Sequence, residues 1–75
     1  MNDQPEFNSI VLEMPPGRIA PFKAIIESYD NLATLRTEDP RRHRLRLYFS
    51  PALAREVEAL LASIRAEFRI HTITG

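Results

Sequence analysis

The sequence predicts an α+β domain in which two helices cover one face of a four-stranded antiparallel sheet. Four short segments show the alternation of apolar and polar residues that is typical of half-buried strands. Two longer segments carry apolar stripes at helical spacing. These segments follow one another as strand, helix, strand, strand, helix, strand, within 75 residues that leave room for a single domain.

The first strand is expected at residues 7–14. Every second residue from Ile10 onward is apolar and should face the core, whereas Val11 is an apolar residue on the opposite face. The Pro-Pro-Gly sequence that follows should end the strand, because proline cannot donate to a sheet ladder. Residues 1–6 are expected to form a flexible lead-in.

The first helix is expected at residues 18–30. Proline inside a helix costs about 3 kcal/mol, so Pro21 should lie in the first turn and place the start near Arg18. Asn31 should adopt the left-handed conformation that often ends a helix. Five apolar residues should form the stripe that faces the sheet: Ile19, Phe22, Ile25, Ile26 and Tyr29.

The second strand is expected at residues 32–37, and the turn that Asp39 and Pro40 predict should connect it as a hairpin to a third strand at residues 44–49. The third strand alternates strictly. Its apolar residues, Leu45, Leu47 and Phe49, should face the core, and Arg44, Arg46 and Tyr48 should face away.

The second helix is expected at residues 51–67, with Ser50 as its cap and Pro51 at its first position. A short last strand should follow within residues 68–73, with Ile70 facing inward. The apolar stripe of the helix comprises Leu53, Val57, Leu60, Leu61, Ile64 and Phe68.

This element order predicts a ferredoxin-like βαββαβ two-layer sandwich spanning residues 7–75, with the sheet order 4-1-3-2. Strands one and three should be central, and we expect these two to run parallel. The face of the sheet that the helices leave open is a candidate interaction surface. Its candidate residues are Val11, Arg36, Arg44, Arg46, Tyr48, Arg69, His71 and Ile73.

The segment Met14–Leu32, MPPGRIAPFKAIIESYDNL, resembles the start of an ACT domain in its Pro-Gly turn and its apolar spacing. ACT-like domains are regulatory modules that pair and often hold an amino acid near the turn after strand one. The resemblance therefore implies a homodimer and an amino-acid ligand. By the same resemblance, the ligand-binding residues would be Pro16, Gly17, Arg18 and Asn31.

The whole chain also resembles short bacterial proteins that are catalogued as a domain of unknown function. The similarity lies in the run KAIIESYDNLATLRTEDP and in the L-x-L strand that leads into an acidic and apolar helix.

Composition narrows the classes of function. Ten Lys and Arg residues balance ten Asp and Glu residues, so no overall field draws the chain to nucleic acid or to a membrane. The absence of cysteine excludes disulfides and thiolate metal sites and fits the cytoplasm. Apolar runs are too short to span a membrane, and the N-terminus does not resemble a signal peptide. We expect a soluble, unprocessed, cytoplasmic protein.

No catalytic residue is predicted, because no serine or threonine has a paired base at a meaningful spacing. His43 and His71 are expected to lie too far apart to share a metal ion, and no metal or cofactor is expected. The first hypothesis is a non-catalytic regulatory or interaction module that acts as a homodimer, through an amino acid or other small molecule or through a protein partner. It is not expected to be an enzyme.

Two alternatives remain. The arginine-rich open face could bind RNA or single-stranded nucleic acid, although arginines opposite Glu13 and Glu38 are more often a solvated or paired face. A small hydrolase of the acylphosphatase type shares the topology, but three prolines remove backbone donors from the loop that would hold the phosphate. Gly17 is likewise explained as a plain turn residue.

Overall fold

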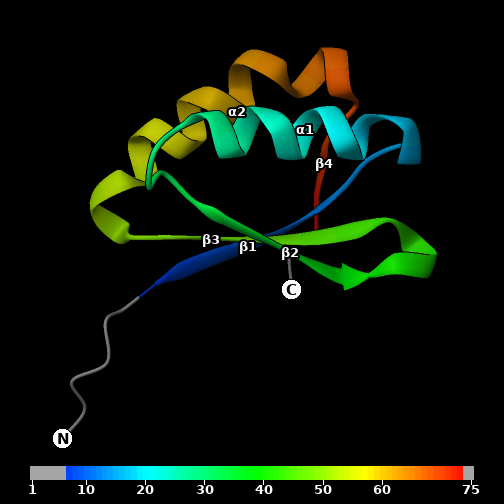
Figure 1. The fold of residues 1–75 in the computed structure, drawn as a ribbon, viewed down its shortest axis with the longest axis horizontal. Coiled ribbons are helices and arrows are strands. Elements are labelled where there is room, and N and C mark those ends of the chain that lie inside the picture. Colours follow the sequence, from blue (N-terminus) through cyan, green and yellow to red (C-terminus); the bar gives the residue numbers. More distant parts are fainter. Residues whose placement is uncertain (1–6, 74–75) are drawn as a thin grey trace, which may run out of the picture.

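The computed structural model describes residues 7–73, which form one layer of strands and one layer of helices (Figure 1). The predicted lead-in, residues 1–6, lies outside the described residues. The predicted βαββαβ two-layer sandwich is confirmed. Its elements are β1 (Asn8–Glu13), α1 (Pro16–Ser28), β2 (Thr34–Asp39), β3 (Arg44–Phe49), α2 (Ala54–Phe68) and β4 (His71–Ile73), with 3₁₀ turns at Pro40–Arg42 and Pro51–Leu53.

The sheet order is β2-β3-β1-β4, which is the predicted order counted from the opposite edge. The prediction that the two central strands run parallel is wrong, because Asn8 lies opposite Phe49 and Glu13 lies opposite Arg44 in an antiparallel pair. The hairpin makes β3 antiparallel to β2. The α1 crossover returns the chain so that β2 is parallel to β1, and β3, which lies between these two strands, is antiparallel to both.

The predicted alternation along β3 is confirmed, since Leu45, Leu47 and Phe49 are buried beneath the helices. The rings of Phe22 and Phe68 meet edge to face at 6.4 Å between centroids and join the two helices. The remaining buried apolar residues are Leu12, Met14, Ile26, Leu32, Val57, Leu61 and Ile70.

Helix α1 begins at Pro16, two residues before the predicted start, so Pro21 lies inside the helix and not in its first turn. A proline suits the first position, because it has no N–H to satisfy and its φ is already helical. The helix ends at Ser28, and the extended backbone of Tyr29 (φ −97°, ψ 119°) takes this residue out of the apolar stripe. The predicted burial of Tyr29 is therefore wrong; the residue is 47% exposed.

The turn after α1 shifts the second strand by two residues relative to the prediction. Asn31 has a φ of 59°, as predicted for a residue in the left-handed conformation. At the far end of β2, the Asp39 carboxylate accepts hydrogen bonds from the backbone N–H groups of Arg41 and Arg42, at 3.1 and 3.4 Å. This Asx-type turn forms the tip of the predicted hairpin.

The predicted apolar stripe of α2 packs against the sheet. The predicted start of this helix at Pro51 is wrong, because Pro51–Leu53 form a 3₁₀ turn and α2 begins at Ala54. Ser50 caps the 3₁₀ turn by accepting a hydrogen bond from the N–H of Ala52, and no side chain caps α2 itself. The last strand is shorter than predicted. Phe68 ends α2, and Arg69 has a φ of 55°, with the N–H groups of Arg69 and Ile70 donating back to helix carbonyls. The expectation that Arg69 lies in a strand on the open face is therefore wrong, because Arg69 forms the joint between α2 and β4.

Candidate functional site

The open face of the sheet consists of three rows of side chains that cross the strands. The structure brings seven of the eight predicted surface residues to this face, Arg69 being the exception. One row contains Thr34, Tyr48 and Ser9; the next contains Arg36, Arg46, Val11 and Ile73; the third contains Arg44, Glu13 and His71.

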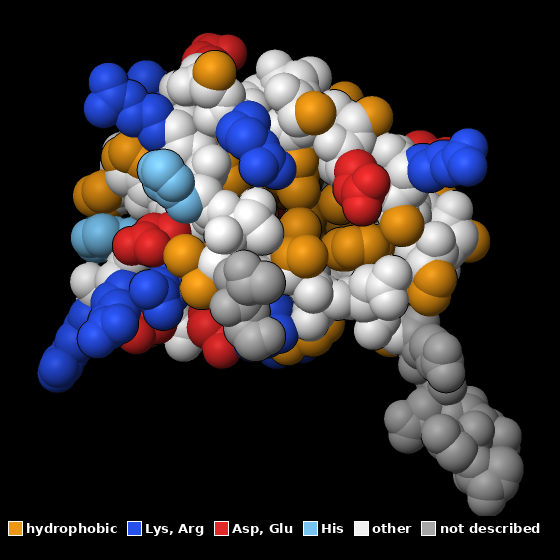
Figure 2. Space-filling view, turned by 180° about the vertical axis from the view of Figure 1, so that it is seen from behind, with side chains coloured by type: hydrophobic (Ala, Val, Ile, Leu, Met, Phe, Trp, Pro, Cys, Tyr) orange, Lys and Arg blue, Asp and Glu red, His pale blue; other side chains and the backbone are white. Residues whose placement is uncertain are grey.

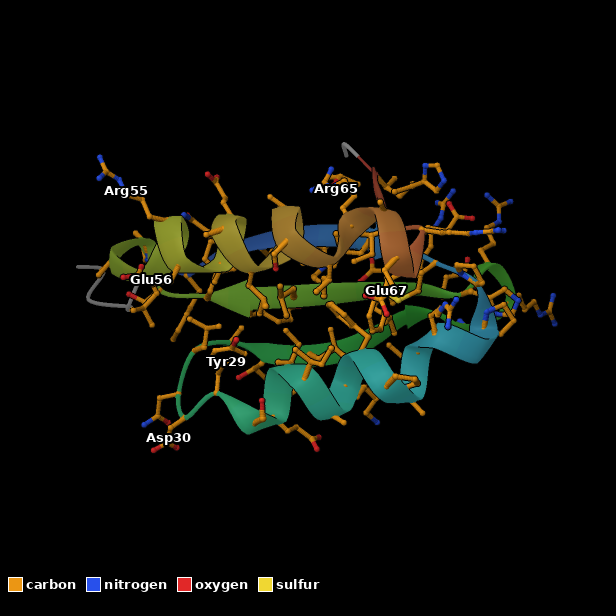
Figure 3. All side chains as sticks on the ribbon, turned by 90° about the horizontal axis from the view of Figure 1, so that it is seen from above. Tyr29, Asp30, Arg55, Glu56, Arg65 and Glu67 are labelled. Atoms are coloured by element: carbon orange, nitrogen blue, oxygen red, sulfur yellow. The ribbon has the colours of Figure 1, made fainter. Side chains whose placement is uncertain are left out.

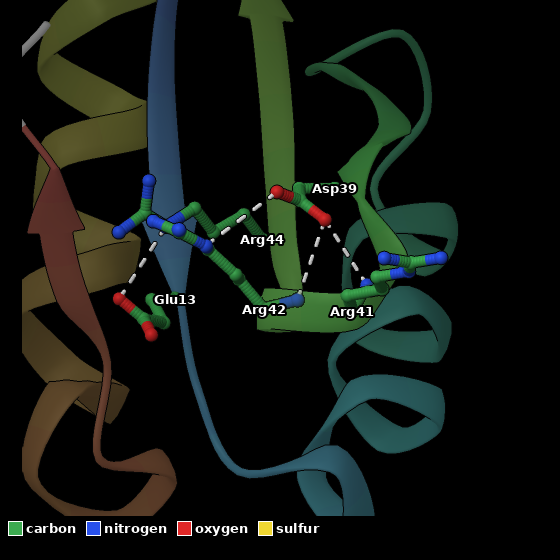
Figure 4. A network of polar contacts seen from close by, with 5 residues as sticks. All are labelled: Glu13, Asp39, Arg41, Arg42 and Arg44. Atoms are coloured by element: carbon green, nitrogen blue, oxygen red, sulfur yellow. Dashed lines mark hydrogen bonds and ion pairs between the residues drawn. The ribbon is translucent and has the colours of Figure 1, made fainter.

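The two central arginines of this open face are paired with carboxylates. Arg46 donates from Nε and Nη2 to the two carboxylate oxygens of Glu38, at 2.9 and 3.2 Å, and from Nη1 to Ser9 Oγ at 2.9 Å. Arg44 Nε lies 3.6 Å from Glu13 Oε1 (Figure 4). The hydrogen bonds from Arg46 lower the pKa of the Glu38 carboxyl, and the same bonds raise the pKa of Arg46. Arg46 and Glu38 thus largely neutralise each other, whereas Arg44 Nε is near Glu13 without a hydrogen bond.

This pairing predicts a stabilisation that depends on pH. The stabilisation is present above the ordinary pKa of glutamate, about 4.3, and is lost as the pH falls through the lowered pKa of folded Glu38. At neutral pH, Glu38→Gln is therefore expected to have a lower urea midpoint than the wild type. In strong acid, the two proteins should have the same midpoint. The effect should be small, because both side chains are partly exposed. Glu27→Gln, on the exposed side of α1, is the control, and an equal gap for Glu38→Gln at both pH values would contradict the pairing.

The open face also carries apolar side chains, among them Val11, Tyr48 and Ile73. Phe7 is 60% exposed and shares a shallow hollow of 260 Å³ with Thr34, Arg36 and Tyr48. Phe7 is not among the predicted surface residues. Phe7 lies two residues before Ser9, and alternate residues of a strand point to the same side of the sheet. This spacing could have predicted that Phe7 lies on the open face.

The four residues that the ACT resemblance implies as a ligand site are not brought together within one chain. Pro16, Gly17 and Arg18 form the start of α1, whereas Asn31 follows its far end. Figure 3 shows Tyr29 and Asp30 at that far end. The guanidinium of Arg18 lies over the ring of Phe68, 6.0 Å from its centroid, so a contact with the core holds it in place.

A second hollow, of 450 Å³, lies where β1 ends, beside the β2–β3 hairpin and the α2–β4 joint. Both histidines line it. Figure 2 shows both histidines at one end of the molecule, with basic and acidic side chains around them. No three potential metal ligands gather anywhere in the part of the chain that the structure describes. The lining residues are Glu13, Met14, Pro15, Arg42, His43, Arg69 and His71, and an adjoining hollow of 370 Å³ is lined by Pro15, Gly17, Arg18 and Arg69.

Comparison with known proteins gives a family. The family model described as Domain of unknown function (DUF4911) matches residues 12–67, more than half of the chain. The chain belongs to the DUF4911 family. Its matched segment runs from β1 to the last turn of α2 and confirms the resemblance to proteins of unknown function. No curated protein and no solved structure matches this DUF4911 chain. Neither helix of its described residues is long and apolar enough to cross a membrane.

Proposed function

We propose that this chain is a non-catalytic, ACT-like interaction module that pairs with a second copy of itself through the open face of its sheet. One observation carries the proposal: Arg46 is hydrogen-bonded to Glu38 at 2.9 Å, and Arg44 forms an ion pair with Glu13 at 3.6 Å. Because these charges are neutralised, the apolar side chains remain as the groups that can gain from contact with a partner.

The size of the domain gives a reason for pairing. A chain of 75 residues buries roughly 60 to 65% of its unfolded surface and is only marginally stable alone. Phe7 and Tyr48 form one corner of the open face, and Val11 lies beside Ile73 across the β1–β4 pair. Sheets pack face to face about 10 Å apart, so a second copy could cover this surface with its own. Within each copy, the pairing of Arg44 and Arg46 with carboxylates avoids burying these two charges unmatched, and Arg36 lies on the edge strand β2.

Binding of single-stranded nucleic acid through the same face is the second candidate. It is supported by the hollow between Phe7 and Tyr48, where a base could stack, and by Arg36, which has no carboxylate partner among the described residues. It is less favoured, because the two arginines nearest the centre of the face are engaged and would have to leave their carboxylates to contact phosphates.

Light scattering after size-exclusion chromatography tests the pairing. At tens of micromolar, the chain is expected to elute at twice its own mass, and Val11→Glu is expected to elute as a monomer because it places a charge at the centre of the face. Thr37→Glu is the matched control. Thr37 lies opposite Leu45, so it belongs to the helix side of the sheet and should leave the dimer intact.

A monomeric wild-type chain at this concentration would overturn the proposal, as would equal effects of the two glutamate variants. Tight binding of a short single-stranded RNA that weakens with salt, and that is lost in Tyr48→Ala, would instead support the second candidate.

A further inference from the structure

The hollow at the end of β1 gathers arginines and histidines from distant parts of the chain. The β2–β3 hairpin supplies Arg42 and His43, the α2–β4 joint supplies Arg69, and β4 supplies His71. Arg18, at the start of α1, reaches the adjoining hollow, which also contains Arg69. The whole sequence is neutral, so this concentration of cationic side chains is a local feature of the fold.

Arg42 and Arg69, the two arginines that line the hollow, are exposed and so available to a ligand. Arg42 makes only a 3.9 Å contact with Asp39, its side chain is 66% exposed, and it extends toward β1 (Figure 4). Arg41, next to it in the hairpin, points to the opposite side. Glu13 is the one carboxylate among the lining residues, and Arg44 already faces it. An anion that enters the hollow would therefore meet cations with little competition.

Two of the lining residues have a backbone conformation that is unfavourable for residues other than glycine. His43 has a φ of 56° and Arg69 has a φ of 55°, both in the left-handed region. Glycine adopts this conformation without strain, whereas a side chain with a Cβ atom does not. The chain thus holds a histidine and an arginine at two turn positions where glycine would make the fold more stable. Strain of this kind is found at functional sites, where the side chain is needed for another purpose.

We infer that this hollow binds a small, soluble, phosphate-bearing compound. Guanidinium groups match phosphate oxygens with paired, charge-assisted hydrogen bonds, and imidazoles can add further donors. A free amino acid fits the hollow less well, because its ammonium group would have only Glu13, which Arg44 already contacts. The site depends on side chains and not on the start of α1, where Pro15 and Pro16 have no N–H to donate.

An amide NMR titration of the whole chain tests this inference. Pyrophosphate, orthophosphate and AMP are added separately, which distinguishes free phosphate from a phosphate ester. Sodium chloride at equal ionic strength and glutamate serve as controls. Amide shifts that saturate are expected at residues 42–43 and 69–71 with at least one phosphate compound. Absence of such shifts, shifts confined to the corner of the open face around Phe7 and Tyr48, or equal responses to chloride or glutamate would overturn the inference.

Glycine variants then separate binding from folding. Arg69→Gly is expected to weaken phosphate binding about tenfold, because one charged partner is lost, while the urea midpoint stays the same or rises. His43→Gly should show the same pattern with a smaller loss of affinity. Asn31→Gly is the matched control, since Asn31 has the same left-handed backbone (φ 59°) but lies outside this hollow.

Arg55→Gln controls for charge alone, because Arg55 lies at the other end of α2 from Arg65 and from the joint (Figure 3). Unchanged affinity in Arg69→Gly, or an equal loss in Arg55→Gln, would contradict the site. The hollow needs no second copy of the chain. The mass of the particle in solution, measured in the same samples, shows whether each variant is a monomer or a dimer. A failure of phosphate binding can therefore be distinguished from a failure of the proposed pairing.

Discussion

Replacing Phe22 by alanine is expected to lower the free energy of unfolding by about 3 to 5 kcal/mol, the usual cost of removing a buried aromatic ring. Phe22 is fully buried, and its ring contacts Phe68 at the junction of the two helices and the sheet. The single core of a domain with fewer than about 80 residues rarely supplies more than about 3 to 5 kcal/mol in total. A large fraction of the variant should therefore be unfolded at room temperature, as measured by urea titration followed by circular dichroism.

Tyr29→Ala provides the matched comparison at the end of the same helix. Tyr29 is the cap residue of α1 and is 47% exposed. Its replacement should change the free energy of unfolding by less than about 0.5 kcal/mol, as is usual for a surface site. A loss as large as that of Phe22→Ala would mean that Tyr29 belongs to the buried stripe after all.

Leu61→Ala in α2 should cost about 2 to 5 kcal/mol. Leu61 is 2% exposed and lies in the centre of the helical stripe. Leu60, one residue earlier, is only partly buried and packs at the margin of the core, so Leu60→Ala should cost clearly less. Thermal unfolding of the two variants gives the comparison. Equal losses would show that α2 presents a different face to the sheet.

The parts of the fold that follow from local periodicity could be predicted from the sequence. Alternation along β3 identified Leu45, Leu47 and Phe49 as core residues, and the spacing of Val57 and Leu61 identified the buried side of α2. The order of elements then allowed only a few sheet topologies, because crossover connections are right-handed and strands joined by a short hairpin pair with each other. The sheet order followed from these rules.

Element ends were harder to predict, because turn geometry decides them. Helix α1 ends at Ser28, and the backbone of Tyr29 is already extended. Because the prediction continued the helical spacing to Tyr29, it wrongly placed the ring of this residue against the sheet. Arg69 looked like a strand residue in an alternating tail, but two hydrogen bonds to helix carbonyls hold the chain there in a left-handed turn. The direction of the central strands was missed because the inserted hairpin strand reverses the polarity expected for a simple βαβ unit.

The candidate sites depend on which side chains the fold brings together. Pairing of arginines with Glu13 and Glu38 was one of the interpretations that the sequence allowed, and the structure shows it. His43 and His71 line one hollow, which could not be predicted from the sequence because 27 positions separate them. They come together because β1 pairs with both β3 and β4, so that Glu13 lies opposite Arg44 on one side and His71 on the other.

The edge strand β2 also bears on how the protein avoids aggregation. Its register against β3 shifts between Thr37 and Asp39, which leaves Glu38 as the extra residue of a bulge, and Arg36 lies two positions earlier. A bulge interrupts the regular row of donors and acceptors that another strand would need, and charged side chains add repulsion between like edges. Addition of further chains at this edge, as in an amyloid fibril, is therefore disfavoured by the backbone itself.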